Sequence, residues 1–230
     1  MTRQSYATEI RIIRVMCTGR VDMNFVLRAL RGGADGVIIG GCWPGECHYV
    51  TEGNYDALGN MLLLRKLLKS VGIAPERLRL EWISAAEGAR FAEIMSDFAG
   101  GLRELGPIGE GEGLDAETLG IKLDALTRLV PFVKLVEREK LRVTDKSEEA
   151  YGAVYESEKT DRLIRGLLAD KLATSQILAL LEAGPLTTAE IAGRLALDPS
   201  DVSRHMNGSS RRGLVRYDLE EKRYALAGAT

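Results

Sequence analysis

The stretch Gly36–Val50, GVIIGGCWPGECHYV, joins a buried strand to a loop rich in metal-binding side chains. Its first part, Gly36–Gly41, is short, apolar and β-branched, which predicts a buried strand. Cys42 and Cys47 follow at once, separated by a Pro-Gly turn, and His48 comes directly after the second cysteine. The whole chain has three cysteines and two histidines. This concentration predicts a metal or redox site, with two cysteines in a buried loop as the alternative.

Strands and helices are predicted to alternate on both sides of this stretch. Ile10–Met16 and Leu78–Ser84 have the pattern of buried strands. Apolar residues recur at helical spacing in three segments, Asp22–Arg31, Asn54–Val71 and Ala85–Leu105. The predicted order is therefore β-α-β-α-β-α, which is typical of a small parallel sheet. We expect the α/β class for this part of the chain, with a flavodoxin-like arrangement.

The three cysteines are predicted to meet at one edge of this sheet. Cys17 directly follows the first predicted strand, and Cys42 and Cys47 follow the second. Ligands bind outside the carboxyl ends of parallel strands, so residues far apart in sequence converge there. A two-iron cluster takes four ligands, normally thiolates, and structural zinc takes four from cysteine and histidine. The alternatives are cysteines that act as small buried hydrophobes and a His48 that only forms hydrogen bonds in the loop.

Composition and charge disfavour several classes of function. The 230 residues carry a net charge of −2 and a pI of about 5.9, whereas affinity for phosphates needs an excess of Lys and Arg. The first residues lack a basic segment followed by a long apolar run, so no signal peptide is expected. No apolar run approaches the roughly 18 residues of a membrane helix. We therefore expect a cytoplasmic protein, in which clustered cysteines are ligands or redox thiols.

The second half of the chain is predicted to be helical. Leu105–Gly113, rich in Pro, Gly and Glu, ends the first domain. Asp115–Leu141 is predicted to be a helix with a kink or break at Pro131, and the highly charged segment Arg142–Lys159 is predicted to be a connector. We expect three parts: an iron–sulfur domain at 1–107, a helical and charged connector at 108–159, and a final domain at 160–230.

The final domain has the pattern of a winged helix-turn-helix, three helices followed by a hairpin. The predicted signals are a helix from Thr160 that ends at Gly184, a helix start at Thr187 or Thr188 with Glu190 in a capping box, a cap at Asp198, and a turn at Glu220–Lys222.

Charge argues against DNA as the ligand of this domain. Gln176–Thr230 contains seven Lys or Arg and seven Asp or Glu. Asp198 and Asp201 lie where a recognition helix around Ser203–His205 would meet the bases, and carboxylates repel phosphate. Four residues could still form a local basic face, Arg204, Arg211, Arg212 and Arg216. We expect a module for protein docking, because a fold does not fix a function.

The blocks RIIRVMCTGRVD, GADGVIIGGCWPGECHY, EGNY and GIAPERLRLEWISAAEGARFAEI resemble, in order, the delta subunit family of methyl-viologen-reducing hydrogenase. The resemblance covers about Tyr6 to Pro107. It implies a small electron-transfer protein with a [2Fe-2S] cluster, between a hydrogenase or formate dehydrogenase and a heterodisulfide-reductase-A-like flavoprotein. By motif, Cys17, Cys42 and Cys47 match the family's cysteines. Longer members of the family carry a tail similar to a winged helix.

The chain departs from this family at the cysteine loop and at its start. Trp43 stands where the family usually has histidine, and Glu46 where it usually has aspartate. The family also has a strand and a C-x-x-C block upstream of the segment that aligns with TRQSY, so the resemblance implies that one strand and at least one cluster ligand are absent here. A misread start, a separate chain, or a cluster that is lost or completed by His48 or by a partner would account for this. We favour a lost or misread N-terminus.

The expected function is electron transfer in a hetero-oligomeric oxidoreductase complex, without catalysis by this chain. No acid–base pair or nucleophile constellation is present, and we expect Glu81 and Glu87 to be structural and Trp82 to belong to the core or to a docking surface. Two alternatives remain: a redox-sensing regulator whose cluster domain controls a DNA-binding winged helix, and a docking subunit that has lost its cluster.

Overall fold

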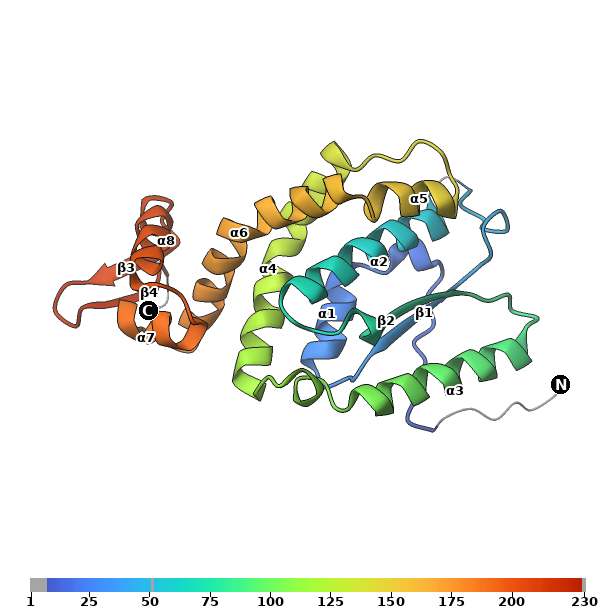
Figure 1. Cartoon of the computed structure of the whole chain (residues 1–230), viewed down its shortest axis with the longest axis horizontal. Coiled ribbons are helices and arrows are strands. Elements are labelled where there is room, and N and C mark those ends of the chain that lie inside the picture. The colour runs from blue at the N-terminus through green and yellow to red at the C-terminus, as the bar shows by residue number, and fades with distance from the viewer. Residues whose placement is uncertain (1–7, 51, 229–230) are drawn as a thin grey trace.

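The computed structural model describes residues 8–50 and 52–228, so the predicted limits at Met1, Tyr6 and Thr230 lie outside the described residues. The molecule is elongated (Figure 1). A large body of helices around a small sheet forms one end, and a small unit of helices and a hairpin forms the other. In the described part of the chain, no helix is both long enough and apolar enough to cross a membrane.

The predicted parallel sheet is present with two strands. β1 (Val37–Gly41) pairs in parallel with β2 (Leu78–Trp82), and Gly41 lies opposite Trp82 at the carboxyl edge. Three helices match the three predicted ones: α1 (Met23–Arg31), α2 (Gly53–Ser70) and α3 (Gly88–Leu105). In Figure 1, α2 and α3 flank the sheet on opposite sides. The mixed α/β class is confirmed.

The strand predicted at Ile10–Met16 is wrong. This segment has no regular structure, and no backbone–backbone hydrogen bond joins it to another described residue. Its apolar side chains face solvent, with Ile13 86% and Met16 fully exposed. A strand is stable only when its backbone groups are paired and one of its faces is packed. This segment has neither condition, and Arg11 and Arg14 interrupt its apolar run.

Local signals fixed the helix ends well, with one exception. Asp22 caps α1 as predicted, because its carboxylate accepts a hydrogen bond from the backbone N–H of Asn24 at 2.9 Å. The third helix, predicted to start at Ala85, begins at Gly88. The reason is a turn in which the Glu87 carboxylate accepts from the backbone N–H of Ser84 at 2.7 Å.

The helix predicted with a kink or break at Pro131 runs through that residue, and the segment predicted as a charged connector takes part in the first core. α4 (Ala116–Lys140) continues through Pro131 as one helix. The charged connector contains α5 (Glu148–Tyr155), whose Tyr151 and Tyr155 are buried against α2 and α4. The first hydrophobic core therefore extends well beyond residue 107. Three short 3-10 helices complete this part: η1 (Thr18–Arg20), η2 (Pro75–Arg77) and η3 (Glu110–Glu112).

α6 (Glu158–Leu181) joins two separate cores. Ile164 and Leu168 pack in the first core, and Ile177 and Leu180 pack in the second. The predicted capping box and the predicted cap at Asp198 are both present. The elements of the small unit are α7 (Thr188–Leu195), α8 (Pro199–Arg211), β3 (Val215–Asp218) and β4 (Arg223–Leu226), with β3 and β4 antiparallel.

A buried ion pair holds the amino ends of both strands. Arg77, which is fully buried, donates to Glu112 through Nε at 2.6 Å and through Nη2 at 3.1 Å. Its Nη1 donates to the carbonyl oxygens of Asp35 and Gly106. Burial alone would raise the pKa of Glu112, but hydrogen bonds from Arg77 and from backbone N–H groups outweigh burial and lower the pKa.

Replacing Arg77 with methionine should lower the free energy of unfolding by about 3–5 kcal/mol, because Glu112 would stay buried without its partner. Urea denaturation measures this change. The control is Arg31→Met, which removes an exposed pair with Asp124 and should cost less than about 1 kcal/mol.

The same ion pair gives a pH dependence. The folded-state pKa of Glu112 lies below its unfolded value of about 4.3, so its stabilising contribution is present above that pH and is lost as pH falls through the folded pKa. The stability gap between Arg77→Met and wild type should therefore be full above about pH 5 and shrink below about pH 4. A gap that is the same at both ends of this range would contradict the assignment.

Candidate functional site

Three segments approach closely at the carboxyl edge of the sheet. A methyl group on Gly19 would lie only 2.6 Å from the carbonyl oxygen of Gly53, at the start of α2. A methyl group on Gly41 would lie 2.9 Å from the Trp82 ring and 3.1 Å from the hydroxyl of Thr18. Glycine therefore lets η1 pack on the backbone at the start of α2, and lets the end of β1 pack on the side chains of Trp82 and Thr18. Each cysteine lies within six residues of one of these contacts.

Gly53 places two sulfur atoms on the same side of α2. Its backbone has φ +46°, and a Cβ there would overlap Cys47 Sγ and lie 3.7 Å from Cys17 Sγ. Cys47 is buried and Cys17 half-buried. The predicted convergence of these two thiols, 30 residues apart, is therefore present in space.

Cys42 belongs to the same group but lies at the surface. Its pKa is raised above the usual thiol value, mainly by partial desolvation and to a lesser extent by the neighbouring thiols of Cys47 and Cys17. Its backbone carbonyl accepts a hydrogen bond from Asn54 Nδ2 at 3.2 Å. Asn54 follows Gly53 in the first turn of α2, so one helix end contacts all three cysteine segments.

The donor set suits an iron–sulfur cluster in its chemistry, because soft thiolates are the ligands of such clusters. The space over Gly53, which a side chain would need, is taken by the Cys47 sulfur, with the Cys17 sulfur beside it. In the described residues, however, no three His, Cys, Asp or Glu side chains are arranged as a metal site. The thiols are near one another without being drawn into coordination geometry.

The ring of His48 packs on Tyr49. The side chain is exposed, and its ring meets Tyr49 edge-on, with centroids 5.1 Å apart. Its role as a fourth ligand stays a prediction.

Comparison with known proteins decides the family. Residues 1–106 match the family model of the methyl-viologen-reducing hydrogenase delta subunit. Over 105 residues, 46% of this chain, the protein is 55% identical to the iron-sulfur D subunit of the F420-non-reducing hydrogenase from Archaeoglobus profundus, and the match covers 76% of that protein. The chain belongs to the delta subunit family of methyl-viologen-reducing hydrogenase.

Other members and relatives differ in how the matched region is used. The corresponding iron-sulfur D subunit from Methanococcus voltae is 48% identical over 105 residues, 46% of this chain and 72% of that protein. The A subunit of the Ferredoxin/F(420)H(2)-dependent CoB-CoM heterodisulfide reductase from Methanosarcina acetivorans is 52% identical over 109 residues, 47% of this chain but only 14% of that protein. The delta-subunit region thus occurs both as most of a small protein and as a minor part of a large one.

Trp43, the residue that departs from the expected family loop, is fixed by a polar contact. Its Nε1 donates to Glu87 Oε2 at 2.8 Å, and the guanidinium of Arg90 lies 5.1 Å from its ring centroid. The hydrogen bond from Trp43, with one from the backbone N–H of Ser84, lowers the pKa of Glu87. Glu87 is therefore structural, as expected, and it ties the cysteine loop to the turn before α3.

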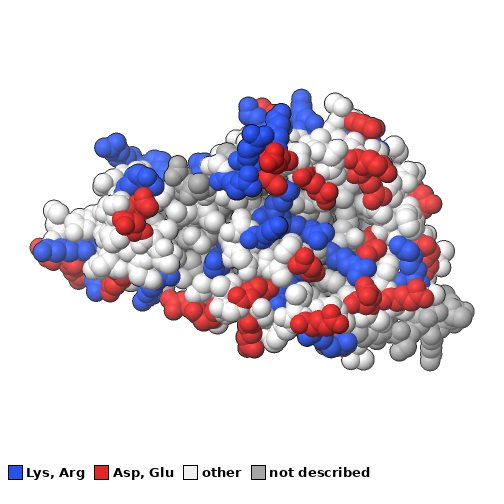
Figure 2. All heavy atoms as spheres, in the orientation of Figure 1, with Lys and Arg blue, Asp and Glu red and all other residues white. Residues whose placement is uncertain are grey.

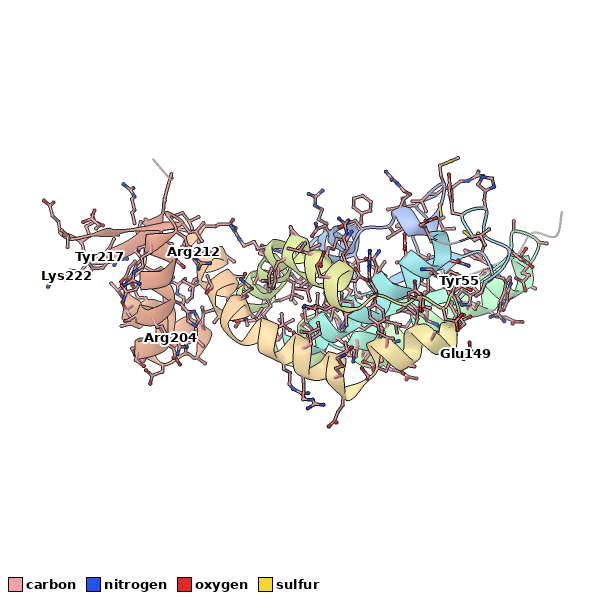
Figure 3. All side chains as sticks on the ribbon, turned by 90° about the horizontal axis from the view of Figure 1, so that it is seen from above. Tyr55, Glu149, Arg204, Arg212, Tyr217 and Lys222 are labelled. Carbon is pink, nitrogen blue, oxygen red and sulfur yellow. The ribbon has the colours of Figure 1, made fainter. Side chains whose placement is uncertain are left out.

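A stack of tyrosines supports the other side of the α2 start. The rings of Tyr55 and Tyr151 lie 5.6 Å apart, those of Tyr151 and Tyr155 lie 5.9 Å apart, and Tyr155 donates to Glu137 at 2.6 Å. Figure 3 shows Tyr55 on α2 near Glu149 of α5. A cavity of about 530 Å³ adjoins this stack. The site at the three cysteines is therefore held in part by α4 and α5, which lie outside the residues 1–106 that match the family.

Sequence reasoning identifies the cysteines but not the residues that bring them together. Thr18, Gly19, Gly53 and Asn54 have this role, and no sequence pattern singles them out. The one weak signal is that the block EGNY forms the start of a long helix and places a glycine there, where glycine is only modestly favoured.

Gly53→Ala should strain the backbone of α2 and should also displace the cysteine sulfur atoms that pack on Gly53. The matched control is Gly72→Ala, because Gly72 also has positive φ, +78°, but open space around it. Both variants should lose about 1–2 kcal/mol of stability from the left-handed backbone. Only Gly53→Ala forces the Cys47 sulfur to move, so it should also lose any bound metal, measured as metal per chain. Equal metal content in both variants would contradict this assignment.

Proposed function

We propose that this chain is an electron-transfer subunit that carries a [2Fe-2S] cluster held by Cys17, Cys42 and Cys47. The observation that carries the proposal is the convergence of the three cysteine segments on the first turn of α2, within the region that matches the family. When bound, the cluster would accept and release one electron at a time. The relative from Archaeoglobus profundus is named as an iron-sulfur protein, which supports this class of cofactor.

The chain's own residues would hold and shield the cluster. Cys47 is 6% exposed, so its thiolate would be kept away from water. The start of α2 next to the sulfur atoms has the positive end of a helix dipole, which favours negative charge there. Cys42 lies at the surface and would provide the side from which electrons enter or leave.

The fourth ligand lies outside the three cysteines. His48 is the candidate within this chain, and a ligand from an upstream segment or a partner is the alternative. Imidazole in place of thiolate would raise the reduction potential.

The proposed partners are a heterodisulfide-reductase-A-like flavoprotein and a hydrogenase. The relatives support both: one is named as part of a hydrogenase, and the heterodisulfide reductase protein from Methanosarcina acetivorans contains a region similar to this chain. A formate dehydrogenase as the donor belongs to the proposal on the family resemblance alone. Together these proteins would form a hetero-oligomeric complex.

We assign three functional parts: a cluster domain of flavodoxin-like type at 1–107, a connector at 108–159, and a winged-helix docking domain at 160–230. Arg204, Arg212, Tyr217 and Lys222 lie at the end of the molecule away from Tyr55 (Figure 3). On the face drawn in Figure 2, acidic and basic side chains lie beside one another at this end. Such mixed charge favours a protein partner over DNA.

Anaerobically purified protein should contain about two irons and two acid-labile sulfides per chain, with a rhombic EPR signal after reduction by dithionite. Serine in place of Cys17, Cys42 or Cys47 should remove the iron. If protein isolated with its partners holds no iron, the proposed cofactor is wrong for this chain.

The two histidines give a matched test of the fourth ligand. His48→Asn should change the EPR signal and lower iron content if His48 is a ligand, whereas His205→Asn should change neither, because His205 contacts Thr174 in the other unit. A His48→Asn protein identical to wild type would assign the fourth ligand to another segment or chain.

The docking role can be tested on the exposed hairpin. Leu219 is 82% exposed, so Leu219→Asp should leave the fold intact. It should weaken co-elution with the flavoprotein if the hairpin contacts it. Leu135→Asp on α4, where Leu135 is 55% exposed, is the control and should bind as wild type does. Undiminished binding by Leu219→Asp would exclude the hairpin from the interface.

A further inference from the structure

Asn54 is the buried polar side chain nearest to the cysteine loop whose role the family match does not explain. It lies in the first turn of α2 and is 1% exposed. Its Nδ2 donates to the backbone carbonyl of Cys42 at 3.2 Å. Its Oδ1 accepts no hydrogen bond from the described residues.

The unpaired Oδ1 of Asn54 therefore lowers the stability of the folded state. A buried polar atom without a partner costs more free energy of folding than a typical single hydrogen bond contributes. An apolar residue of similar size would avoid that cost and would fill the same space. The part of Asn54 that an apolar residue cannot replace is the donor to Cys42.

Cys42 is the cysteine that needs such a donor. Cys47 is buried and its sulfur packs on Gly53, so its position is set by contact. Cys42 is exposed and follows the last residue of β1, so packing does not fix it. The bond from Asn54 ties its backbone to the same helix turn against which the other two sulfur atoms lie.

We propose that Asn54 is a positioning residue, which anchors the Cys42 backbone to the start of α2 and so keeps the Cys42 sulfur in register with Cys17 and Cys47. The proposal rests on the proposed function in one respect, that these sulfur atoms bind a cluster. The hydrogen bond of Asn54 is made to the backbone of Cys42, not to its sulfur. It acts through that cysteine.

The test compares Asn54→Leu with Asn60→Leu in the full-length chain. Both exchange an amide for an apolar side chain of similar size on α2, but Asn60 has no side-chain hydrogen bond among the described residues. Asn54→Leu removes the unpaired oxygen together with the donor, so its unfolding midpoint should equal or exceed that of wild type. A merely structural role predicts a lower midpoint instead.

Two further measurements distinguish an effect on the position of Cys42 from an effect on overall stability. In reduced protein without metal, hydrogen–deuterium exchange of the peptide 42–50 should be faster in Asn54→Leu and unchanged in Asn60→Leu, with exchange in α7 and α8 the same in both. In anaerobically purified protein, a chelator should remove iron from Asn54→Leu about tenfold faster or more, as for other groups that orient metal ligands.

The outcomes distinguish this proposal from the proposed function. Faster exchange at 42–50 with faster iron loss and an undiminished midpoint supports the anchor. Faster exchange in a chain that never holds iron supports the anchor and overturns the cluster. Unchanged exchange, or iron retention equal to wild type, overturns the anchor and leaves the cluster intact.

Discussion

Arg77 joins four segments through one buried guanidinium, and the position of the cysteine edge depends on this contact. From the end of η2 it holds the segment before β1 through Asp35, the end of α3 through Gly106, and η3 through Glu112. A two-stranded parallel sheet is only marginally stable alone. Because the strands pair in register from Val37 to Gly41, fixing their amino ends also fixes where their carboxyl ends stop. The cysteine loop leaves the sheet from that second end.

At the carboxyl edge, three glycines allow neighbouring atoms to approach more closely than a side chain would permit. Gly19, Gly41 and Gly53 allow three segments to meet where larger residues would separate them. This brings three thiols into a small volume, which is electrostatically unfavourable once they ionise; partial desolvation and the neighbouring thiols raise the pKa of Cys42. A bound cation relieves that repulsion, since metal ligation deprotonates thiols outright. The proposed cluster would therefore stabilise this arrangement.

The predictability of this fold differs between local and long-range features. Capping at Asp22, Thr187 and Asp198 is readable because each signal lies within three residues of its partner. The absence of a strand at Ile10–Met16 could not be predicted in this way. The segment has the residue pattern of a strand, but a strand also needs a neighbouring strand to pair with, and the pattern does not show whether one is there. The site follows the same division. The end of β1 locates Cys42 and Cys47, whereas the position of Cys17 depends on the close approach of η1 to the start of α2. The anchoring role of Asn54 likewise depends on a contact between loop and helix that no spacing reveals.

The region outside the family match is added here to a module that relatives have either as most of a small protein or as part of a larger one. In the heterodisulfide reductase protein from Methanosarcina acetivorans the similar region is part of one large polypeptide, and such a covalent link gives a high effective concentration. A separate chain lacks that tether and needs an interface. Here α6 packs in both cores, and ion pairs of Arg128 with Glu182 and of Arg194 with Glu117 brace the small unit against α4 (Figure 1). A partner bound at the small unit would therefore also fix the orientation of the cysteine edge.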